Sequence, residues 1–546
     1  MPAADPVQTR AELAAVRPEL IEAYDAALPR ARAEILARVL GALDREPLPG
    51  ASLVRFPAGA AAMFAQVPPG LTVHVDGQAV RDPAELAGRL GWARGLREEL
   101  ANSVANLTLA YANPRPPSDR PLLDPSSPAA LADFEQLVTD GHPLHPCCRT
   151  RTGLDVAGVL AYAPEHRGTL RLVRLGVPAG RWHGDGPPEL LAHPWQADRL
   201  RREYPWLDRL GETGPVRPLM SLRTVDAGGE HVKTAVDIQM TSAVRTVSPA
   251  AVHNGPRLSA LLRSMIARLP APGPALDALR SGDRGPAAPA GRAARGPASD
   301  GGAAGGPASV GDASGGAAFD VLAEFGAGAV LVDGRPDRRL AHLRREAPRV
   351  GPGEVVLPLA ALAAVDPYDG KPVLWQVARE PYAWWEELTA LLVPPLLALL
   401  DRGVALEAHG QNTLVVLRGG RPVRVLYRDF GGVRISPARL AAAGVEVPPL
   451  AGDLPSDDGD ELRTKLAAAL FGAVTGQLVA VLARGGADAE KLWGVTGRAV
   501  AATGTADARA LLTRPLPVKA TTAMRLAADP LDDIWAYVPN PLEVAA

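Results

Sequence analysis

The sequence predicts a multidomain α+β protein, and three observations support this fold class. The chain has 546 residues, too many for one ordinary domain. Apolar residues recur at helical spacing over residues 12–43 and 82–109, with charged residues on the faces between them. Over residues 169–247, strand-like runs alternate with Gly/Pro turns, which indicates a central antiparallel sheet region.

Prolines mark the boundaries of the helical N-terminal unit. Pro18 and Pro29 are expected to divide the first helical stretch, because proline interrupts the backbone hydrogen bonds of a helix. After Tyr111, the segment ANPRPPSDRP ends the unit. We therefore expect three domains, at residues 1–115, 116–370 and 371–546.

A low-complexity segment interrupts the second half of the chain. Residues 283–318 contain almost no large apolar side chain, which predicts a disordered insertion within a domain. Short strands are expected after it, followed by a helix over residues 384–400. A hairpin over residues 404–433 and a largely helical region from residue 460 complete the chain.

The composition is that of a soluble globular protein and excludes several classes. Hydrophobic residues make up 47% and charged residues 22%, and a net charge of −2 gives no nucleic-acid footprint. Cys147 and Cys148 are neighbours and cannot staple distant segments, and no second cysteine pair follows to form a zinc site. The N-terminus lacks the apolar core of a secretory signal, and the apolar run 388–400 is too short to span a bilayer. We expect a cytoplasmic protein that binds neither membranes nor nucleic acid.

The first of three polar clusters is TDGHPLHPCCRTRTGLD, at residues 139–155. Pro143 and Pro146 disfavour a helix, so an ordered loop is expected. The loop gathers four potential cations that suit a polyanion such as a triphosphate: His142, His145, Arg149 and Arg151. A solvated basic loop without a ligand explains the same residues equally well.

The second cluster, HVKTAVDIQMTSAVRT at residues 231–246, alternates apolar and polar residues as a half-buried strand does. Its polar face presents Lys233 and Thr241 in one direction, with Arg245 four residues further on. Two more polar residues lie on a neighbouring strand if the intervening DAGGE forms a hairpin turn: Ser221 and Arg223. An ordinary amphipathic strand with its polar face in water is the alternative.

The third cluster, ALEAHGQNTLVVLRGGRPVRVLYRDFGG, covers residues 405–432. TLVVL and VRVLY predict strands, and the Gly-Gly pair between them predicts a hairpin turn. With the turn centred there, Asn412 is expected opposite Tyr427, with Asp429 just beyond. Polar side chains then meet at one end of the hairpin: Glu407, His409, Gln411, Asn412 and Asp429. Their carboxylate and amide oxygens suit Mg²⁺, which also binds substrate phosphates.

In this order the three clusters resemble the signature blocks of the NRPS-independent siderophore synthetases, the IucA/IucC family. That family shows a GHPxHPxxKxRxG block, a K…TS…RT block and an HGQN…RD block, which here begin at Gly141, Lys233 and His409. The resemblance extends from about residue 100 to the end of the chain. Arg149 replaces the lysine of the first block and keeps its charge, and Leu154 stands where an aromatic residue is common.

The resemblance implies a thumb, fingers and palm architecture, with a helical thumb and a kinase-like palm around a central cleft. It also implies an ATP-dependent ligase that adenylates a carboxylic acid and joins it to an amine, hydroxylamine or alcohol, releasing AMP and pyrophosphate. The cofactors are then ATP and Mg²⁺, and the acid is of the citrate, dicarboxylic or hydroxamate type. Members of the family often form homodimers, although no motif in this sequence indicates one.

The resemblance also implies roles for individual residues. The ATP-binding residues would be His142, His145, Arg149, Arg151, Ser221, Arg223, Lys233 and Arg245. The substrate-binding residues would be Thr241, Arg245, His409 and Gln411. The metal ligands would be Asn412 and Asp429, with Glu407 nearby. The catalytic residues would be Arg245, His409 and Lys233.

Other functions compete with this one. A kinase-like phosphotransferase explains AHGQN followed by RDFGG, but Gln411 stands where a kinase needs an aspartate, and no Gly-rich loop with a VAIK-like strand precedes it. A homologue that binds its ligands without catalysis is a second alternative. A ferric reductase is disfavoured, because two adjacent cysteines cannot ligate an iron–sulfur cluster.

Overall fold

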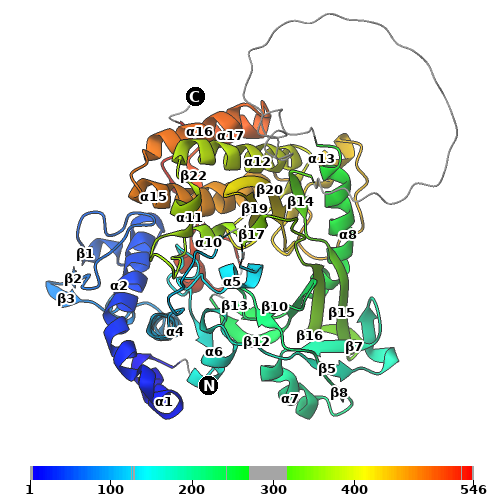
Figure 1. Ribbon diagram of the computed structural model, residues 1–546, viewed down its shortest axis with the longest axis horizontal. Helices are drawn as coiled ribbons and strands as arrows, with labels where there is room; N and C mark the ends of the chain where they lie inside the picture. The colour runs from blue at the N-terminus through cyan, green and yellow to red at the C-terminus, as the bar shows by residue number, and fades with distance from the viewer. Residues whose placement is uncertain are drawn as a thin grey trace, which may run out of the picture.

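The computed structural model describes residues 4–124, 126, 129–241, 243–269, 317–529 and 532–543. Helices and strands are both abundant, so the predicted α+β class is confirmed. Figure 1 shows an N-terminal unit (blue) on the left, a group of sheets at the lower right and a helix-covered sheet at the top. The low-complexity segment predicted at residues 283–318 lies outside the described residues except for its last two positions.

The N-terminal unit is built on long helices, as predicted. Helix α2 (Ile21–Arg45) packs along α4 (Arg94–Ala112) and buries Ile35, Leu36 and Leu40. A small antiparallel sheet that was not predicted lies beside them. The remaining elements are α1 (Pro6–Val16), β1 (Val54–Arg55), β2 (Val73–Val75), β3 (Gln78–Val80) and α3 (Pro83–Arg89).

The two prolines of the first helical stretch behave differently. Pro18 ends α1 as predicted, and a short 3₁₀ turn, η1 (Pro18–Leu20), leads into α2. The prediction that Pro29 divides the stretch is wrong, because α2 continues through it. Pro29 and Asp25 are both exposed, so water can bind the Asp25 carbonyl that lacks a helical N–H partner. Packing of α2 against α4 offsets the cost of about 3 kcal/mol that proline imposes inside a helix.

Antiparallel sheets form the middle of the molecule, as predicted. The largest has the strand order β6-β15-β16-β11-β10-β9, and every neighbouring pair in it is antiparallel. Two smaller sheets have the orders β13-β12-β4 and β7-β5-β8. The strands are β4 (Arg151–Thr152), β5 (Val173–Gly176), β6 (Trp182–Gly184), β7 (Glu189–Ala192), β8 (Asp208–Glu212), β9 (Arg217–Pro218), β10 (Thr224–Asp226), β11 (Glu230–Thr234), β12 (Val236–Met240), β13 (Ala243–Arg245), β15 (Glu324–Val332) and β16 (Arg335–Glu346). The helices among them are α5 (Leu131–Glu135), α6 (Val156–Tyr162), α7 (Pro194–Glu203) and α8 (Pro249–Ile266).

The single strand predicted over residues 231–246 is wrong, because the chain forms three strands there. Strand β11 belongs to the large sheet, whereas β12 and β13 pair with each other in a small one. Ala235 lies where the chain passes from one sheet to the other, and Thr241, with φ of 60°, lies in the tight turn before β13. The predicted DAGGE hairpin turn is confirmed, because β10 pairs with β11. Ser221 and Arg223 precede β10 instead of lying on it.

The C-terminal part surrounds the sheet β14-β20-β19-β17 with helices. The predicted hairpin forms the centre of this sheet, and Gly419 and Gly420 join its strands with positive φ of 57° and 79°, as a tight two-residue turn requires. The elements are β14 (Phe319–Val321), β17 (Glu354–Pro358), α10 (Leu359–Leu362), α11 (Val373–Val377), α12 (Pro381–Asp401), β18 (Val404–Ala405), β19 (Thr413–Arg418), β20 (Arg421–Tyr427), β21 (Arg434–Ile435), α13 (Pro437–Ala442), α14 (Gly459–Ala467), the π-helical η5 (Ala468–Thr475), α15 (Gly476–Arg484), α16 (Ala489–Ala501), α17 (Ala506–Thr513), β22 (Leu516–Lys519), α18 (Thr521–Leu526) and β23 (Trp535–Val538).

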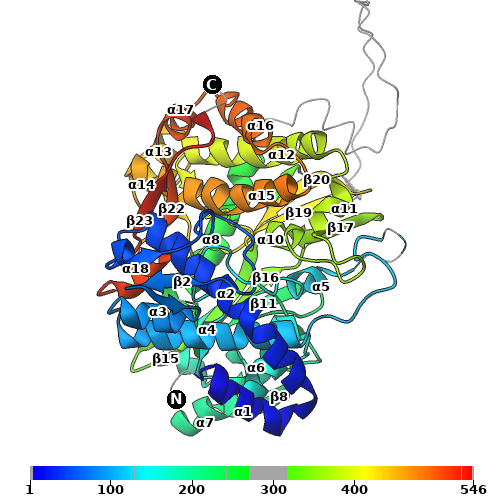
Figure 2. The same ribbon diagram turned by 90° about the vertical axis from the view of Figure 1, so that its left-hand side faces the viewer.

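The two ends of the described chain meet. Figure 2 shows α18, β22 and β23 beside α2 and α3 of the N-terminal unit. The buried carboxylate of Glu46 accepts the backbone N–H groups of Thr522 and Ala523, at 3.0 and 2.7 Å. These two hydrogen bonds fix the first turn of α18 to the N-terminal unit.

Two helical stretches are long and apolar enough to cross a membrane by length and composition, Pro381–Asp401 and Gly459–Arg484. Of the apolar window in each, 61% and 78% respectively is buried inside the protein. Their surroundings are therefore those of core helices. The first corresponds to the helix predicted over residues 384–400, and it continues through Pro394 and Pro395.

Candidate functional site

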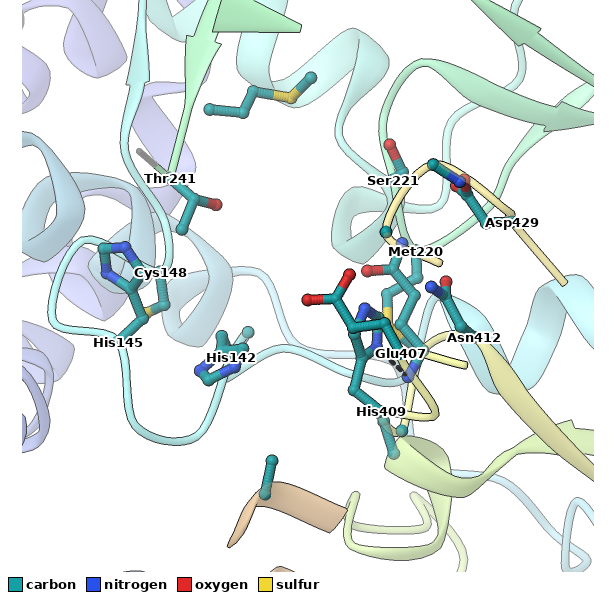
Figure 3. A pocket seen from close by; sticks show the side chains of 18 of the residues that line it. His142, His145, Cys148, Met220, Ser221, Thr241, Glu407, His409, Asn412 and Asp429 are labelled. Carbon is teal, nitrogen blue, oxygen red and sulfur yellow. Dashed lines mark hydrogen bonds between the residues drawn. The ribbon is translucent and has the colours of Figure 1, made fainter. Parts of the chain in front are cut away.

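A cavity of about 650 Å³ collects the three polar clusters. Every residue to which the sequence assigned a role lines it. In Figure 3, His142 and His145 come from the loop on one side, while Glu407, His409, Asn412 and Asp429 come from the other. Segments far apart in the chain thus converge on one site, as the resemblance implied.

The register of the hairpin differs by one residue from the one predicted. Near the turn the pairing is as expected, with Leu417 opposite Pro422. A β-bulge follows, because Pro422 has no N–H to donate to the ladder. Beyond the bulge, Tyr427 pairs with Thr413 and not with Asn412. The polar residues nevertheless meet at the cavity end of the hairpin.

An ion pair joins the second cluster to the third. Lys233 Nζ donates to Asp429 Oδ2 at 2.6 Å, and only 14% of the lysine side chain is exposed. Burial opposes ionisation of Asp429, but Lys233 and Arg345 hold the pKa of this carboxyl well below its usual range. Asp429 also has a φ of 73°, which non-glycine residues adopt rarely. The carboxylate is therefore charged and held in a strained turn at the cavity wall.

Two arginines of the second cluster donate to no carboxylate in the described parts of the chain. Arg223 donates to the carbonyl of Thr246 at 2.7 Å, and Arg245 donates to the carbonyl of Met240 at 3.2 Å. Burial lowers the pKa of both guanidinium groups, and the charge of Arg245 lowers that of Arg223 further. Like charges held together in this way suit an anionic ligand.

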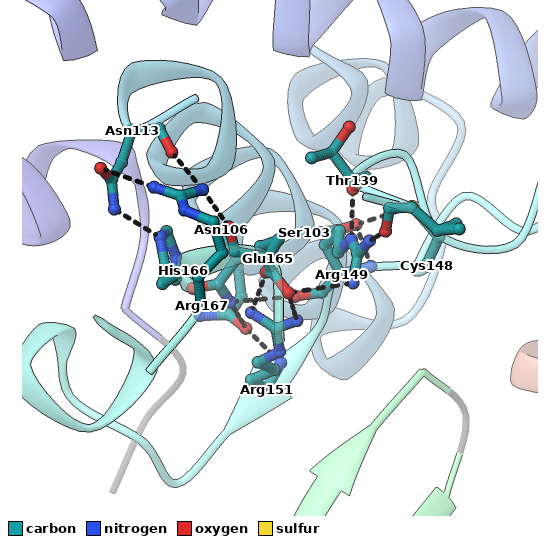
Figure 4. A network of polar contacts seen from close by, with 12 residues as sticks. Ser103, Asn106, Asn113, Thr139, Cys148, Arg149, Arg151, Glu165, His166 and Arg167 are labelled. Carbon is teal, nitrogen blue, oxygen red and sulfur yellow. Dashed lines mark hydrogen bonds and ion pairs between the residues drawn. The ribbon is translucent and has the colours of Figure 1, made fainter. Parts of the chain in front are cut away.

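The first loop offers fewer free cations than predicted. Arg149 and Arg151 are buried, and both pair with the carboxylate of Glu165, at 3.4 and 2.6 Å (Figure 4). Arg149 also donates to the carbonyls of Val138 and Thr139. Burial disfavours the charge of Glu165, but the two guanidinium groups hold its pKa well below its usual range. The expectation of four available cations is therefore wrong, because these two arginines fasten the loop.

The histidines of this loop differ in their surroundings. His145 is buried, and its Nδ1 accepts the N–H of Cys147 at 2.9 Å. Burial lowers the pKa of His145 well below its usual value, so the ring is neutral at pH 7. Since Nδ1 accepts, the proton lies on Nε2, which has no hydrogen-bond partner among the described residues. His142 is exposed to the cavity.

The loop before β19 is held in place by a buried ion pair. The Gln411 carbonyl accepts from Arg428, which itself pairs with Glu135 at 2.7 Å. In the same loop, His409 Nδ1 accepts the N–H of Gln411 at 3.3 Å, so its Nε2–H can donate to a ligand. Burial lowers the pKa of His409, which favours this neutral form.

The predicted metal ligands supply oxygen atoms but no complete cage. Among the described residues, no group of three His, Cys, Asp or Glu side chains could hold a metal ion. Glu407 Oε2 lies so close to Gly432 that a Cβ on this glycine would be only 1.9 Å from the oxygen. Asp429 also lines the cavity. Asn412 adds an amide oxygen. Mg²⁺ needs only one or two carboxylates when phosphate oxygens and waters complete its shell. This donor set therefore fits Mg²⁺ bound together with a polyphosphate.

Sequence reasoning missed several charged residues of the cavity. Lys519 pairs with Asp533 at 2.8 Å and lies 3.7 Å from Glu407. Arg345 and Arg434 also line the cavity. Arg345 lies among other charged residues at the end of β16, and Arg434 lies on the two-residue strand β21, so no sequence signal distinguishes them.

Two family models match the chain. The model of the IucA / IucC family matches residues 130–188 and 185–281. The model of the Ferric iron reductase FhuF-like transporter matches residues 382–531, a segment that contains no cysteine.

The named relatives and structures are siderophore enzymes. Staphyloferrin A synthase from Staphylococcus aureus is 27% identical over 358 residues, 56% of this chain and 53% of that protein. The matched part of the chain thus spans about half the length of this curated relative. The crystal structure of the petrobactin biosynthesis protein AsbB from Bacillus anthracis superposes with a TM-score of 0.73 at 18% identity, over 100% of this chain and 99% of that one. ATP-bound aerobactin synthetase IucA from Klebsiella pneumoniae gives a TM-score of 0.69 at 18% identity, over 93% and 99%.

The fold is thus that of solved siderophore synthetases, arranged around a cavity lined by cations. Over residues 130–281 the sequence matches the model of the IucA / IucC family.

Proposed function

We propose that this chain is an ATP-dependent ligase of siderophore biosynthesis. It would activate a carboxylic acid as an acyl-adenylate and condense it with an amine, hydroxylamine or alcohol. The observation that carries the proposal is the cavity, in which cations outnumber carboxylates and neither Arg223 nor Arg245 donates to a carboxylate in the described residues. Two comparisons support it: the match to staphyloferrin A synthase and the fold shared with an ATP-bound aerobactin synthetase.

The proposed reaction has two steps. A carboxylate oxygen of the acid attacks the α-phosphorus of ATP, the bond to the bridging oxygen breaks, and pyrophosphate leaves. The nucleophile then attacks the acyl carbon, the bond from that carbon to the AMP oxygen breaks, and the nucleophile loses a proton. The attacking carboxylate is already ionised at neutral pH, so the first step needs no general base. It needs cations that reduce the repulsion between two anions, and the cavity supplies them.

The cations and the three histidines divide between the two substrates in this proposal. Lys233, Arg223 and Arg245 would contact the triphosphate, joined by Ser221, His142 and His145. The Nε2–H of His409 would donate to the carboxylate of the acid, beside Gln411, Thr241 and Arg245. Because Arg149 and Arg151 already pair with Glu165, we assign them to fastening the loop, and their contact with ATP stays a prediction.

Asp429, Asn412 and Glu407 would hold Mg²⁺ together with phosphate oxygens. The ion would neutralise charge on the phosphates. The strained turn at Asp429 and the close contact of Glu407 with Gly432 fix two carboxylates on one wall, and this geometry supports the assignment.

The domain division also stays a proposal. We assign residues 1–115 to a thumb, 116–370 to fingers and 371–546 to a kinase-like palm. Strands β14 and β17 precede residue 371 but pair with the β19–β20 hairpin, so they would complete the sheet of the palm. A cytoplasmic location and a homodimer are further predictions from the resemblance.

A pyrophosphate-release screen across a panel of acids and nucleophiles tests the proposed function. We expect acid-dependent release of pyrophosphate and AMP with at least one citrate-type, dicarboxylic or hydroxamate acid. Production of ADP would identify a phosphotransferase. Binding of ATP and acid without pyrophosphate would identify a homologue that binds but does not catalyse.

A further inference from the structure

We propose that Arg345 is an oxyanion-binding residue that holds the phosphate oxygens at the pyrophosphate end of the triphosphate. No sequence motif singles it out, and the inference rests on the proposed function, because it requires that the cavity bind a nucleoside triphosphate. Arg345 lies on β16, is only 5% exposed, and lines the cavity.

The guanidinium group of Arg345 has no hydrogen-bond acceptor among the described residues. It takes part in no hydrogen bond and no ion pair there, and its Nε is buried without an acceptor. Two nearby arginines do form ion pairs: Arg344 pairs with Glu230 at 2.8 Å, and Arg428 pairs with Glu135 at 2.7 Å. Burying a charge without a partner is costly, so an arginine in this state marks a position that an anionic ligand completes.

Carboxylates lie near this group, and Asp429, Glu324 and Glu135 favour its charge, but none of them accepts a hydrogen bond from it within the described residues. Arg345 lies opposite Glu324 on β15 and opposite His231 on β11, and both side chains are buried. The Glu324 carboxylate accepts the backbone N–H of Phe430. Burial and the charge of Arg345 lower the pKa of His231 to about 2, so this ring is neutral. The row across three strands therefore leaves the N–H donors of Arg345 without an acceptor among the described residues, and an anionic ligand in the cavity would supply one.

The position of Arg345 favours phosphate over the carboxylate of the acid. Lys233 lies two residues beyond His231 on β11, so its side chain shares the face of Arg345 and lies diagonal to it. Lys233 in turn pairs with Asp429, which we assign as a ligand of the Mg²⁺ that would be held together with the phosphates. The acid, by contrast, is assigned to His409, Gln411 and Thr241. Arg345 and Lys233 would thus both bind the β- and γ-phosphates, which leave together as pyrophosphate.

The test is direct binding of inorganic tripolyphosphate to the full-length protein, measured by calorimetry with and without Mg²⁺. A hydrogen bond to a charged group is worth enough that Arg345→Gln should raise the Kd for tripolyphosphate about 10- to 100-fold. The Kd for AMP, which lacks these phosphates, should not change. The matched control is Arg344→Gln, which changes the adjacent arginine of the same strand. Arg344 lies on the opposite face and pairs with Glu230, so this substitution should leave the Kd for tripolyphosphate and the Kd for AMP unchanged.

A second measurement separates this role from a structural one. Since Arg345 makes no hydrogen bond or close ion pair within the described residues, Arg345→Gln should lower the melting temperature far less than loss of a structural ion pair would. If Arg345→Gln does not fold, Arg345→Lys keeps the charge, loses the planar fork, and should weaken tripolyphosphate binding less than tenfold. Wild-type affinity in both variants, or weaker binding of the acid alone, would overturn the assignment. If the wild-type protein itself fails to bind tripolyphosphate, the proposed function fails with it.

Discussion

Replacing Arg245 by alanine should abolish adenylation while leaving the fold intact. Within the described residues the side chain makes one hydrogen bond, from Nε to the Met240 carbonyl at 3.2 Å, and its charge disfavours that of Arg223. Loss of that bond costs about 0.5–1.5 kcal/mol, and relief of the repulsion offsets part of it. Loss of one preorganised donor to developing charge costs about 10²–10³ in rate. Activity should therefore fall far more than stability.

The assay is acid-dependent AMP formation at saturating ATP and acid, with the melting temperature measured on the same samples. Arg338→Ala is the matched control, because Arg338 is exposed, lies outside the cavity and donates to Thr246 Oγ1 at 2.7 Å. The control should retain wild-type turnover. If Arg245→Ala keeps more than about a tenth of wild-type turnover, the assignment of Arg245 to the reacting phosphate and carboxylate is refuted.

Two further predictions concern carboxylates that pair with cations. Asp429→Asn should lower metal-dependent turnover much more than stability, because it removes a charged ligand proposed for Mg²⁺; a Mg²⁺ titration of the initial rate identical to that of the wild type would make Asp429 structural. Glu165→Gln leaves two buried arginines without a counter-charge and should destabilise the protein by about 3–5 kcal/mol at pH 7, measured by urea unfolding. Because the folded pKa of Glu165 lies below the unfolded value of about 4.3, its contribution is complete above that pH and is lost as the pH falls through the folded pKa. The difference in stability between wild type and Glu165→Gln should therefore shrink on acidification, and a difference that is constant from pH 7 to pH 3 would contradict the ion pair.

Local signals predicted the hairpin and the convergence of the clusters. The Gly-Gly pair requires positive φ at two consecutive positions, and apolar residues continue on both sides of it, so β19 and β20 follow from the sequence. The bulge beside Pro422 was missed because a register centred on the turn assumes a regular ladder. The sequence does show Pro422 at this position, and the N–H that proline lacks predicts an interruption of the ladder.

Partners that are distant in the chain account for most of what the sequence could not predict. Burial alternates along β12 but not along β11, where His231, Val232 and Thr234 are all buried, and the passage to another sheet at Ala235 depends on tertiary packing. Arg149 and Arg151 read as free cations because nothing in their own loop reveals that Glu165 neutralises them. The reverse holds for Arg345, which the sequence suggests is a surface residue of a charged strand, whereas it is buried without a hydrogen-bond acceptor among the described residues.

Transfer of a heavy oxygen tests the central claim most directly. The acid identified in the pyrophosphate screen would be labelled with ¹⁸O in its carboxylate and incubated with ATP and the nucleophile, and the AMP would be examined by mass spectrometry. Attack of the carboxylate on the α-phosphorus places one labelled oxygen in AMP, and the account predicts one ¹⁸O per AMP formed in the first turnover. Unlabelled AMP, or label recovered in inorganic phosphate beside ADP, would contradict an acyl-adenylate and with it the proposed reaction.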